Sequence, residues 1–355
     1  MVIRTAGPRG HRSATQYINA MSNRAKAGEK TAGNRPTPDA DRICRAVDAL
    51  PAGRYLLAVS GGRDSMVMLD AFTARRHDVV GVATFDHASG AAATRAARLV
   101  EREVARRSVP FIAGRGHEGE AGTEAAWRDA RWSFLRRWAV ELSATVVTAH
   151  TRDDQIETVV IRILRDAGAR GLAGMYAESD IARPLLDITR AEISSYAQLH
   201  ELRFVDDPSN DSFAHLRNRV RHQLLPALER SRPGFSGELL DIARRAADWR
   251  IGIDALVDGL GVTPLLSEQG TDGTGVVVPA SAFTLLDASG AAMLWPAIAA
   301  RARIALDWRG TERLAAFTAT GTPGGRIPLS GGAEVQRTAS SFVLRNCGAV
   351  AKLYS

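Results

Sequence analysis

One short segment of the chain has the composition of a phosphate-binding loop. An apolar run precedes it and a helical pattern follows it, so the segment opens a helix whose unpaired N–H groups and positive dipole end favour an anion. Two adjacent glycines let the main chain approach that anion closely, and two serines can add hydroxyl donors. No Gly-Lys-Ser/Thr follows, so the loop is not a Walker A loop, and an ordinary glycine turn is the alternative. The candidate nucleotide-binding residues are therefore Ser60, Gly61, Gly62, Arg63, Asp64 and Ser65.

A second group of polar residues lies after a later apolar run. Asp154 and Glu157 are three apart in a helical pattern, so both carboxylates share one helix face. Such a pair could bind and orient an ammonium group and take up its proton. A solvated acidic helix start is the alternative. His150, just before this helix, could hydrogen-bond a phosphate or simply end the strand.

Two sets of arginines could bind polyphosphate or RNA, because guanidinium groups suit phosphate geometry. Arg128 and Arg131 share one face of an expected helix over residues 124–142, on which Trp127 joins the apolar side. Arg217, Arg219 and Arg221 form a cluster in a later basic helix. An exposed basic helix without a partner is the alternative reading of that cluster.

The elements that carry these residues alternate between strand and helix. Short apolar runs bounded by turn residues predict buried strands, and longer patterns of period 3.6 predict helices. Repeated βαβ units predict a parallel sheet with helices on its faces, that is, an α/β fold. The expected strands are 55–59, 79–85, 109–112, 145–149 and 203–205, and the expected helices between them are 64–72, 91–107, 124–142, 153–165 and 190–200, the last capped by Thr189.

The composition changes along the chain and suggests four parts. Residues 1–36 hold seven basic residues and one acidic residue, a net charge of +6, without apolar periodicity, so we expect a disordered basic tail. Residues 37–230 form the catalytic domain and 231–261 a helical linker. Residues 262–355 form a small α/β domain that we expect to contact RNA.

Bulk properties set further limits. The 355 residues carry a net charge of +7, most of it in the tail, and only three lysines, Lys26, Lys30 and Lys352. Cys44 and Cys347 form no CxxC pair and no metal-ligand spacing, so a reduced, cytoplasmic protein is expected. No run of 18 apolar residues indicates a membrane span. Nothing in the sequence indicates an obligate protein partner.

The loop resembles the SGGxDS signature of the PP-loop ATP pyrophosphatases. That resemblance implies ATP as cosubstrate, pyrophosphate as product and an adenylated intermediate. It also implies that Asp64 helps to hold Mg²⁺ on the phosphates, since a carboxylate is a hard oxygen ligand. The signature leaves the group that becomes adenylated open.

Other segments narrow the choice of substrate. The segments Phe85-Asp86-His87, residues 149–158 (AHTRDDQIET), 183–186 (RPLL), 208–210 (PSN) and 217–226 (RNRVRHQLLP) together resemble tRNA(Ile)-lysidine synthetases over residues 54–230. That family uses ATP to join free L-lysine to C2 of the wobble cytidine in the CAU anticodon of tRNA(Ile). Residues after 262 resemble its C-terminal domain only loosely.

The resemblance also implies roles for particular residues. His87 and His150 would join the nucleotide site, and Asp154 and Glu157 would contact the lysine. Arg128 and Arg217 are assigned to the catalytic site, and Arg131, Arg219 and Arg221 to tRNA binding. Which of these arginines contacts the reacting phosphate and which contacts the tRNA is left open by the sequence.

Three other functions fit parts of the sequence less well. A tRNA thiolase of the same superfamily commonly needs a cysteine pair, which the sequence lacks. A GMP-synthetase-like enzyme would need a glutaminase domain or partner. A catalytically inactive tRNA-binding module would not need the intact loop at Ser60–Ser65.

Overall fold

The computed structural model describes residues 2–4, 38–76, 78–87, 90–116, 124–206, 213, 215–265 and 275–346. These residues separate into two compact units, which interleave along the chain. The first comprises residues 1–155 and 179–219, and the second comprises 156–178 and 220–355. All three lysines lie outside the described residues.

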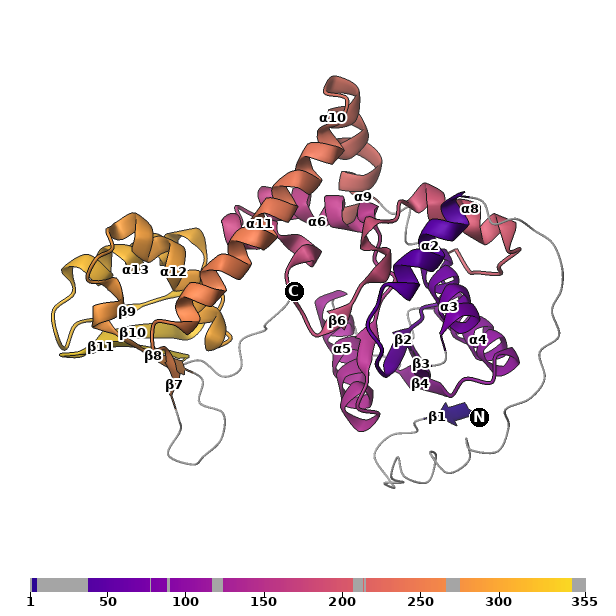
Figure 1. Ribbon diagram of the computed structural model, residues 1–355, viewed down its shortest axis with the longest axis horizontal. Helices are drawn as coiled ribbons and strands as arrows, with labels where there is room; N and C mark the ends of the chain where they lie inside the picture. Colours follow the sequence, from indigo (N-terminus) through magenta and orange to yellow (C-terminus); the bar gives the residue numbers. More distant parts are fainter. Residues whose placement is uncertain are drawn as a thin grey trace. The chain divides into compact units, whose positions relative to one another are not determined.

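The first unit is built on a six-stranded parallel sheet with the strand order β1-β4-β3-β2-β5-β6 (Figure 1). Apolar strand runs are expected in such a sheet because helices cover both faces. The strands are β1 Val2–Arg4, β2 Tyr55–Ala58, β3 Val79–Asp86, β4 Phe111–Arg115, β5 Thr145–Val147 and β6 Ile181–Ala182. The parallel α/β architecture expected from the sequence is confirmed.

Alternate residues of the strands belong to two separate cores. Leu57 and Val147 pack against helices α2 Pro38–Asp48, α3 Arg63–Arg75, α4 Ala91–Arg106 and α8 Arg190–Leu199. Leu56 and Val146 pack on the other side against α5 Glu124–Glu141 (Figure 1). The period of two along each strand therefore determines which helix layer a side chain meets.

Thr189 caps helix α8, as expected from the sequence, and the cap is reciprocal. The Thr189 hydroxyl accepts a hydrogen bond from the Glu192 N–H, and the Glu192 carboxylate accepts one from the Thr189 N–H. A capping box of this kind satisfies two donors that the first helical turn leaves unpaired. It fixes the start of the helix that follows β6.

Three expected features differ in the structure. Residues 202–206 are extended but form no strand, because the Val205 N–H donates to the Gly61 carbonyl of the loop at 3.0 Å and not to a neighbouring strand. Residues 2–4, expected to be part of a disordered tail, pair with β4 as an edge strand. The basic helix is divided into α9 Leu216–Arg219, a π-helical turn Val220–Leu224 and α10 Leu225–Ser231.

The second unit contains an antiparallel five-stranded sheet with the order β7-β8-β11-β10-β9. Its strands are β7 Thr263–Pro264, β8 Gly275–Pro279, β9 Arg326–Pro328, β10 Ala333–Arg337 and β11 Ser341–Asn346. Helices α12 Ala288–Arg301 and α13 Trp308–Thr320 enclose a core around Trp295 and Phe342.

The long helix of the second unit, α11 Phe235–Asp258, lies within the helical linker expected over residues 231–261. Ile253 and Val257 of this helix are buried in the same core as Trp295. The helix expected to be a linker thus contributes to the C-terminal core. Nearer its start, Ala246 and Ala247 pack with Ala173, which follows α7 Ala169–Leu172.

Candidate active site

The loop Ser60–Ser65 joins β2 to α3 in the first unit. Gly61 has φ +87°, and a Cβ atom there would lie 2.8 Å from the carbonyl oxygen of Ala96 on α4. Both observations favour glycine at this position. A left-handed backbone is unfavourable for residues with a side chain, and the Ala96 carbonyl is part of the main chain of α4 and cannot move aside for a Cβ atom. Gly61 therefore brings the loop against α4.

The hydroxyl of Ser65 organises this loop. Its Oγ accepts hydrogen bonds from the N–H groups of Ser60 and Gly61, both at 3.2 Å, and donates to the Gly62 carbonyl at 2.8 Å. Ser65 is buried, and Ser60 Oγ lies 3.2 Å from its Oγ. The sequence suggested Ser65 as a donor to phosphate, but its hydroxyl proton is already donated within the loop.

Arg63 and Asp64 follow the glycines and form the first residues of α3. The Arg63 guanidinium donates to Ser194 of α8 at 3.0 Å and lies 5.7 Å from the centre of the Phe204 ring. Its side chain thus packs against α8, while its main chain belongs to the turn between β2 and α3. The Asp64 carboxylate is 29% exposed, with Oδ1 3.9 Å from Arg63 Nε.

Asp154 lies at the start of α6 Arg152–Leu164, just after β5. Its Oδ2 accepts hydrogen bonds from the Thr151 N–H and hydroxyl at 2.9 and 3.0 Å. Arg190 lies 3.4 Å from the other oxygen. Burial opposes ionisation of this carboxyl, but the Thr151 N–H and the positive charge of Arg217 outweigh burial and lower its pKa. Asp154 is therefore a stable anion and a poor proton acceptor.

His150 lies in the same cluster. Burial lowers its pKa to about 4, and the Asp154 carboxylate opposes this while the charges of Arg183 and Arg217 add to it. Its Nδ1 lies 2.8 Å from the Thr148 hydroxyl. The imidazole is therefore neutral near pH 7, so it can offer a hydrogen bond but not a positive charge to a phosphate.

Glu157 does not share the surroundings of Asp154. Its side chain is 1% exposed and forms a bidentate ion pair with Arg221, with oxygen–nitrogen distances of 2.6 and 3.0 Å. Both residues belong to the second unit. The sequence suggested lysine binding for Glu157 and tRNA binding for Arg221, yet each charge is matched by the other. The shared helix face was real, but a partner 64 residues away determines what Glu157 contacts.

A second polar group surrounds the end of β3. Burial, together with the charge of Arg131, lowers the pKa of His87, and burial also lowers that of Arg131. His87 Nδ1 and Arg131 Nε are buried, and neither has a hydrogen-bond partner within the described part of the chain. Trp127, expected on the apolar side of α5, is 36% exposed, with its ring 6.4 Å from that of His87.

The remaining expected arginines are spread over different surroundings. Arg217 Nη2 lies 3.5 Å from the Asp154 carbonyl oxygen, whereas Arg219 and Arg128 are exposed. Two residues that the sequence reasoning missed belong to the Asp154 cluster, Thr151 and Arg190. Thr151 had a usable signal, because Thr-x-x-Asp at a helix start is a capping pattern. Arg190 had none, since it reaches Asp154 from another helix. Residues 208–210, one of the signature segments, lie outside the described residues.

The sheet brings these groups together. β2 and β5 are neighbours, and the chain leaves β2 toward β3 and β4 before it returns to β5 on the other side. Ligands of open α/β sheets bind at such a change of direction, beyond the carboxyl ends of the strands. The loop Ser60–Ser65 follows β2, and His150 and Asp154 follow β5, so both lie at this edge.

Comparison with known proteins agrees with this arrangement. An ATP-binding family model described as a PP-loop domain matches residues 37–228, just over half of the chain. The fold and the loop therefore define the class as PP-loop proteins. In fold, the chain is similar to the U34-tRNA thiolase NcsA from Methanococcus maripaludis, with a TM-score of 0.51, 15% identity and coverage of 59% of this chain and 80% of that chain.

Curated relatives narrow the class. The tRNA(Ile)-lysidine synthase of Parasynechococcus marenigrum is 30% identical over 296 residues, which cover 79% of this chain and 85% of that protein. The tRNA(Ile)-lysidine synthase of Geobacter sulfurreducens is 37% identical over 236 residues, covering 62% of this chain and 50% of that protein. The chain belongs to the tRNA(Ile)-lysidine synthase family, although it spans only about half the length of some relatives it matches.

Proposed function

We propose that this protein uses ATP to join free L-lysine to C2 of the wobble cytidine in the CAU anticodon of tRNA(Ile). The observation that carries the proposal is the position of the Asp154 cluster beside a phosphate-binding loop, on neighbouring strands of one sheet. An anionic group that can hold an ammonium then lies close to where a nucleotide would be bound. The described residues contain no helix suited to spanning a membrane.

The loop supplies the nucleotide site. The first turn of α3 presents N–H groups that have no acceptor within the helix, and these would bind the phosphates of ATP. Asp64 is the residue that would hold Mg²⁺, which is commonly bound by one or two carboxylates together with substrate phosphates and water. No group of three or more His, Cys, Asp or Glu side chains in the described residues could hold a metal. Mg²⁺ at Asp64 would neutralise charge on the phosphates.

The reaction would proceed in two steps. The C2 oxygen of the cytidine attacks the α-phosphorus of ATP, the bond from that phosphorus to the bridging oxygen breaks, and pyrophosphate leaves. The ε-ammonium of lysine then gives one proton to solvent and the resulting amine attacks C2. The C2–O bond breaks, AMP departs with that oxygen, and the attacking nitrogen gives its second proton to solvent. Arg217 would stabilise negative charge on the phosphate during both displacements.

Asp154 would position the lysine. Because its pKa is lowered, its carboxylate would hold the ε-ammonium as an ion pair and would not itself take up the proton. Arg190 already lies 3.4 Å from this carboxylate, so the ammonium would share it. Glu157 has no part in this proposal because its charge is matched by Arg221.

Other residues would recognise the RNA. The unpartnered ring nitrogen of His87 and the Nε of Arg131 offer hydrogen-bonding groups to a base or phosphate that enters beside Trp127. Bases in single-stranded loops are commonly stacked on aromatic rings in this way. Arg128 and Arg219 are exposed and suit backbone phosphates.

A thiolase reaction is the alternative within the superfamily. Burial raises the pKa of the Cys44 thiol, so the reactive thiolate is disfavoured at neutral pH. Cys347 lies outside the described residues. The lysine reaction is favoured because the Asp154 carboxylate can bind an ammonium group. The Cys44 thiol, with its raised pKa, is poorly suited to carry sulfur.

The experiment is to incubate the protein with ATP, labelled lysine and purified tRNA(Ile) or tRNA(Met). We expect label only in tRNA(Ile), one pyrophosphate per lysine, and no sulfur incorporation. Asp154→Asn should release pyrophosphate but transfer lysine at least about tenfold more slowly, so adenylated tRNA should accumulate. Asp241→Asn, an exposed carboxylate on α11, serves as the control. Absence of label in tRNA(Ile) with the wild type would overturn the proposal.

A further inference from the structure

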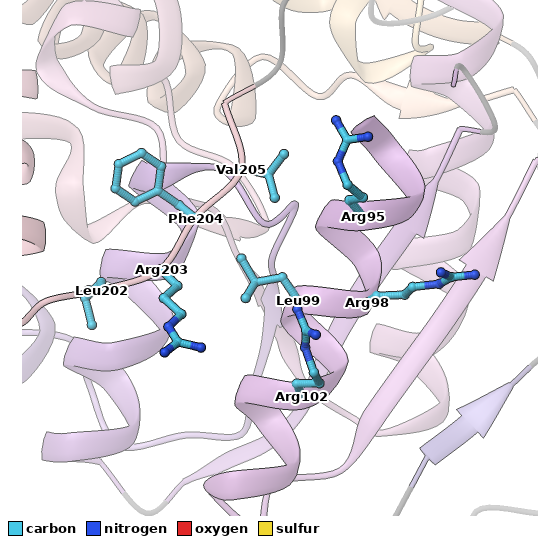
Figure 2. A pocket seen from close by; sticks show the side chains of 8 residues that line it. All are labelled: Arg95, Arg98, Leu99, Arg102, Leu202, Arg203, Phe204 and Val205. Carbon is cyan, nitrogen blue, oxygen red and sulfur yellow. The ribbon is translucent and has the colours of Figure 1, made fainter. Parts of the chain in front are cut away.

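An open groove of about 630 Å³ runs along the first unit between α4 and the extended residues 202–205 (Figure 2). Four arginines line it, three from α4 and one from the facing segment, over an apolar floor that includes Leu99 and Val205. We refer to it as the arginine groove, and its arginines are Arg95, Arg98, Arg102 and Arg203.

The charges of the arginine groove are unmatched. None of its lining residues is acidic, and none of its four arginines forms an ion pair within the part of the chain that the structure describes. Arg106 at the end of α4 and Arg107 directly after it both pair with Glu103. Arg95, Arg98 and Arg102 follow at intervals of three and four residues, which places like charges on one helix face. Such spacing is destabilising without an anion.

The groove leads to the nucleotide loop. The Val205 N–H of one wall donates to the Gly61 carbonyl at 3.0 Å. In the other wall, Ala96 lies between Arg95 and Arg98, and its carbonyl would be 2.8 Å from a Cβ on Gly61. Both walls therefore contact the residue at which the loop turns. An anion bound along the groove would reach the edge of the proposed adenylation site.

The dimensions of the groove fit a polymer of phosphates better than a nucleotide. Arg95 and Arg102 are seven residues apart, which is about 10 Å along a helix at about 1.5 Å per residue. An array of cations of that length can face more than one phosphate of a nucleic-acid backbone. The arginines are exposed, which suits a backbone lying across a surface. A single triphosphate already has its donors in the loop.

We propose that the arginine groove binds the sugar-phosphate backbone of the substrate RNA next to the reacting nucleotide. This inference rests on the proposed function, because it assumes that RNA is brought to the loop. The proposed surface is formed by α4 and residues 202–205. It would hold the RNA strand through its phosphates and would not distinguish between bases.

The test is a triple variant, Arg95→Gln, Arg98→Gln and Arg102→Gln, measured for tRNA binding by fluorescence anisotropy at several salt concentrations. Loss of three phosphate contacts should weaken tRNA binding at least about tenfold near 150 mM salt. It should also reduce the slope of log affinity against log salt by about two. ATP affinity should stay within about twofold of the wild type. Arg106→Gln is the matched control, since Arg106 lies on the same helix, is 64% exposed and is paired with Glu103.

The outcomes separate the two proposals. Unchanged tRNA affinity and salt slope in the triple variant overturn the groove, even if the wild type incorporates lysine. A loss of ATP affinity with normal tRNA binding also overturns it, because the groove then serves the nucleotide. If the wild type incorporates no lysine, the proposed function fails. The groove is then tested by measuring the affinity for a single-stranded RNA oligonucleotide. The triple variant must bind this oligonucleotide more weakly than the wild type does.

Discussion

Two carboxylates three residues apart on one helix, Asp154 and Glu157, meet different partners. Asp154 accepts from the Thr151 N–H and faces Arg190, which keeps it ionised without neutralising it through a bidentate pair. Glu157 is fully engaged with Arg221. From residue type and spacing alone, both carboxylates were equally good candidates for binding an ammonium group. Only the partners in space decide which carboxylate can attract a ligand.

Ser65→Ala tests the organisation of the loop. The substitution removes the acceptor of two N–H groups and the donor to Gly62, at a net cost of about 1 kcal/mol per hydrogen bond. We expect pyrophosphate release to fall about 100-fold while tRNA affinity is unchanged. Ser195→Ala, an exposed serine on α8, should behave as wild type. Wild-type pyrophosphate release by Ser65→Ala would show that the hydroxyl does not organise the loop.

The pKa of His150 leads to a pH dependence. Its folded pKa of about 4 lies below the ordinary 6.5, so unfolding takes up a proton at intermediate pH. The associated stability is present above pH 6.5 and is lost as pH falls toward 4. We expect the free energy of unfolding to drop by about 2 kcal/mol between pH 7 and 5 from this residue.

Urea denaturation at the two pH values measures this drop. His150→Gln should reduce it, since glutamine does not titrate. An equal drop in wild type and His150→Gln would show that His150 is not buried in its neutral form.

At the scale of elements, the sheet and its helices were largely predictable from the sequence. Strands such as Tyr55–Ala58 are short apolar runs between turn residues, and their order in the chain dictates parallel pairing. The start of α8 was predicted from Thr189, because an N-cap is local, and Glu192 completes the cap in the structure.

Features that depend on distant partners were not predictable. The orientation of the Arg63 side chain depends on its hydrogen bond to Ser194. The main chain of residues 202–206 bonds to Gly61 and not to a strand, although the sequence pattern alone suggests a strand. The arginine groove needs α4 and Arg203 to face each other, which no spacing in the sequence reveals.

The ion pair between α6 and the π-helical turn is testable at this scale. Glu157→Gln removes a buried carboxylate from a bidentate ion pair with Arg221, so we expect the free energy of unfolding to fall by about 3 kcal/mol. Glu157→Gln with Arg221→Gln should recover at least about 1 kcal/mol of that loss. The lysine KM of the folded variants should change less than threefold, in contrast to Asp154→Asn. A raised KM without loss of stability would restore Glu157 as a lysine ligand.

At the scale of the whole molecule, the C-terminal sheet cannot be removed cleanly at the end of α11. Ile253 and Val257 are buried in the core that the sheet completes. We expect deletion of residues 262–355 to expose them, with binding of a hydrophobic dye and a loss of about 3 kcal/mol or more, given about 1.5 kcal/mol or more per buried side chain.

The same deletion carrying Ile253→Asn and Val257→Asn is the matched control and should bind much less dye. That variant also allows a fair test of whether residues 262–355 contribute to tRNA affinity. Equal dye binding by both truncated chains would show that another apolar surface is responsible.

The absence of lysine from every described residue has a chemical consequence for an enzyme proposed to consume this amino acid. Arginine stays protonated at all accessible pH values and is not a nucleophile, so the described part of the protein offers no ε-amine that could compete for an activated base. Amine-selective reagents would likewise leave the described part unlabelled. A lysine analogue that carries an amine-reactive group could therefore be followed in the site, with background only from Lys26, Lys30, Lys352 and the N-terminal amine.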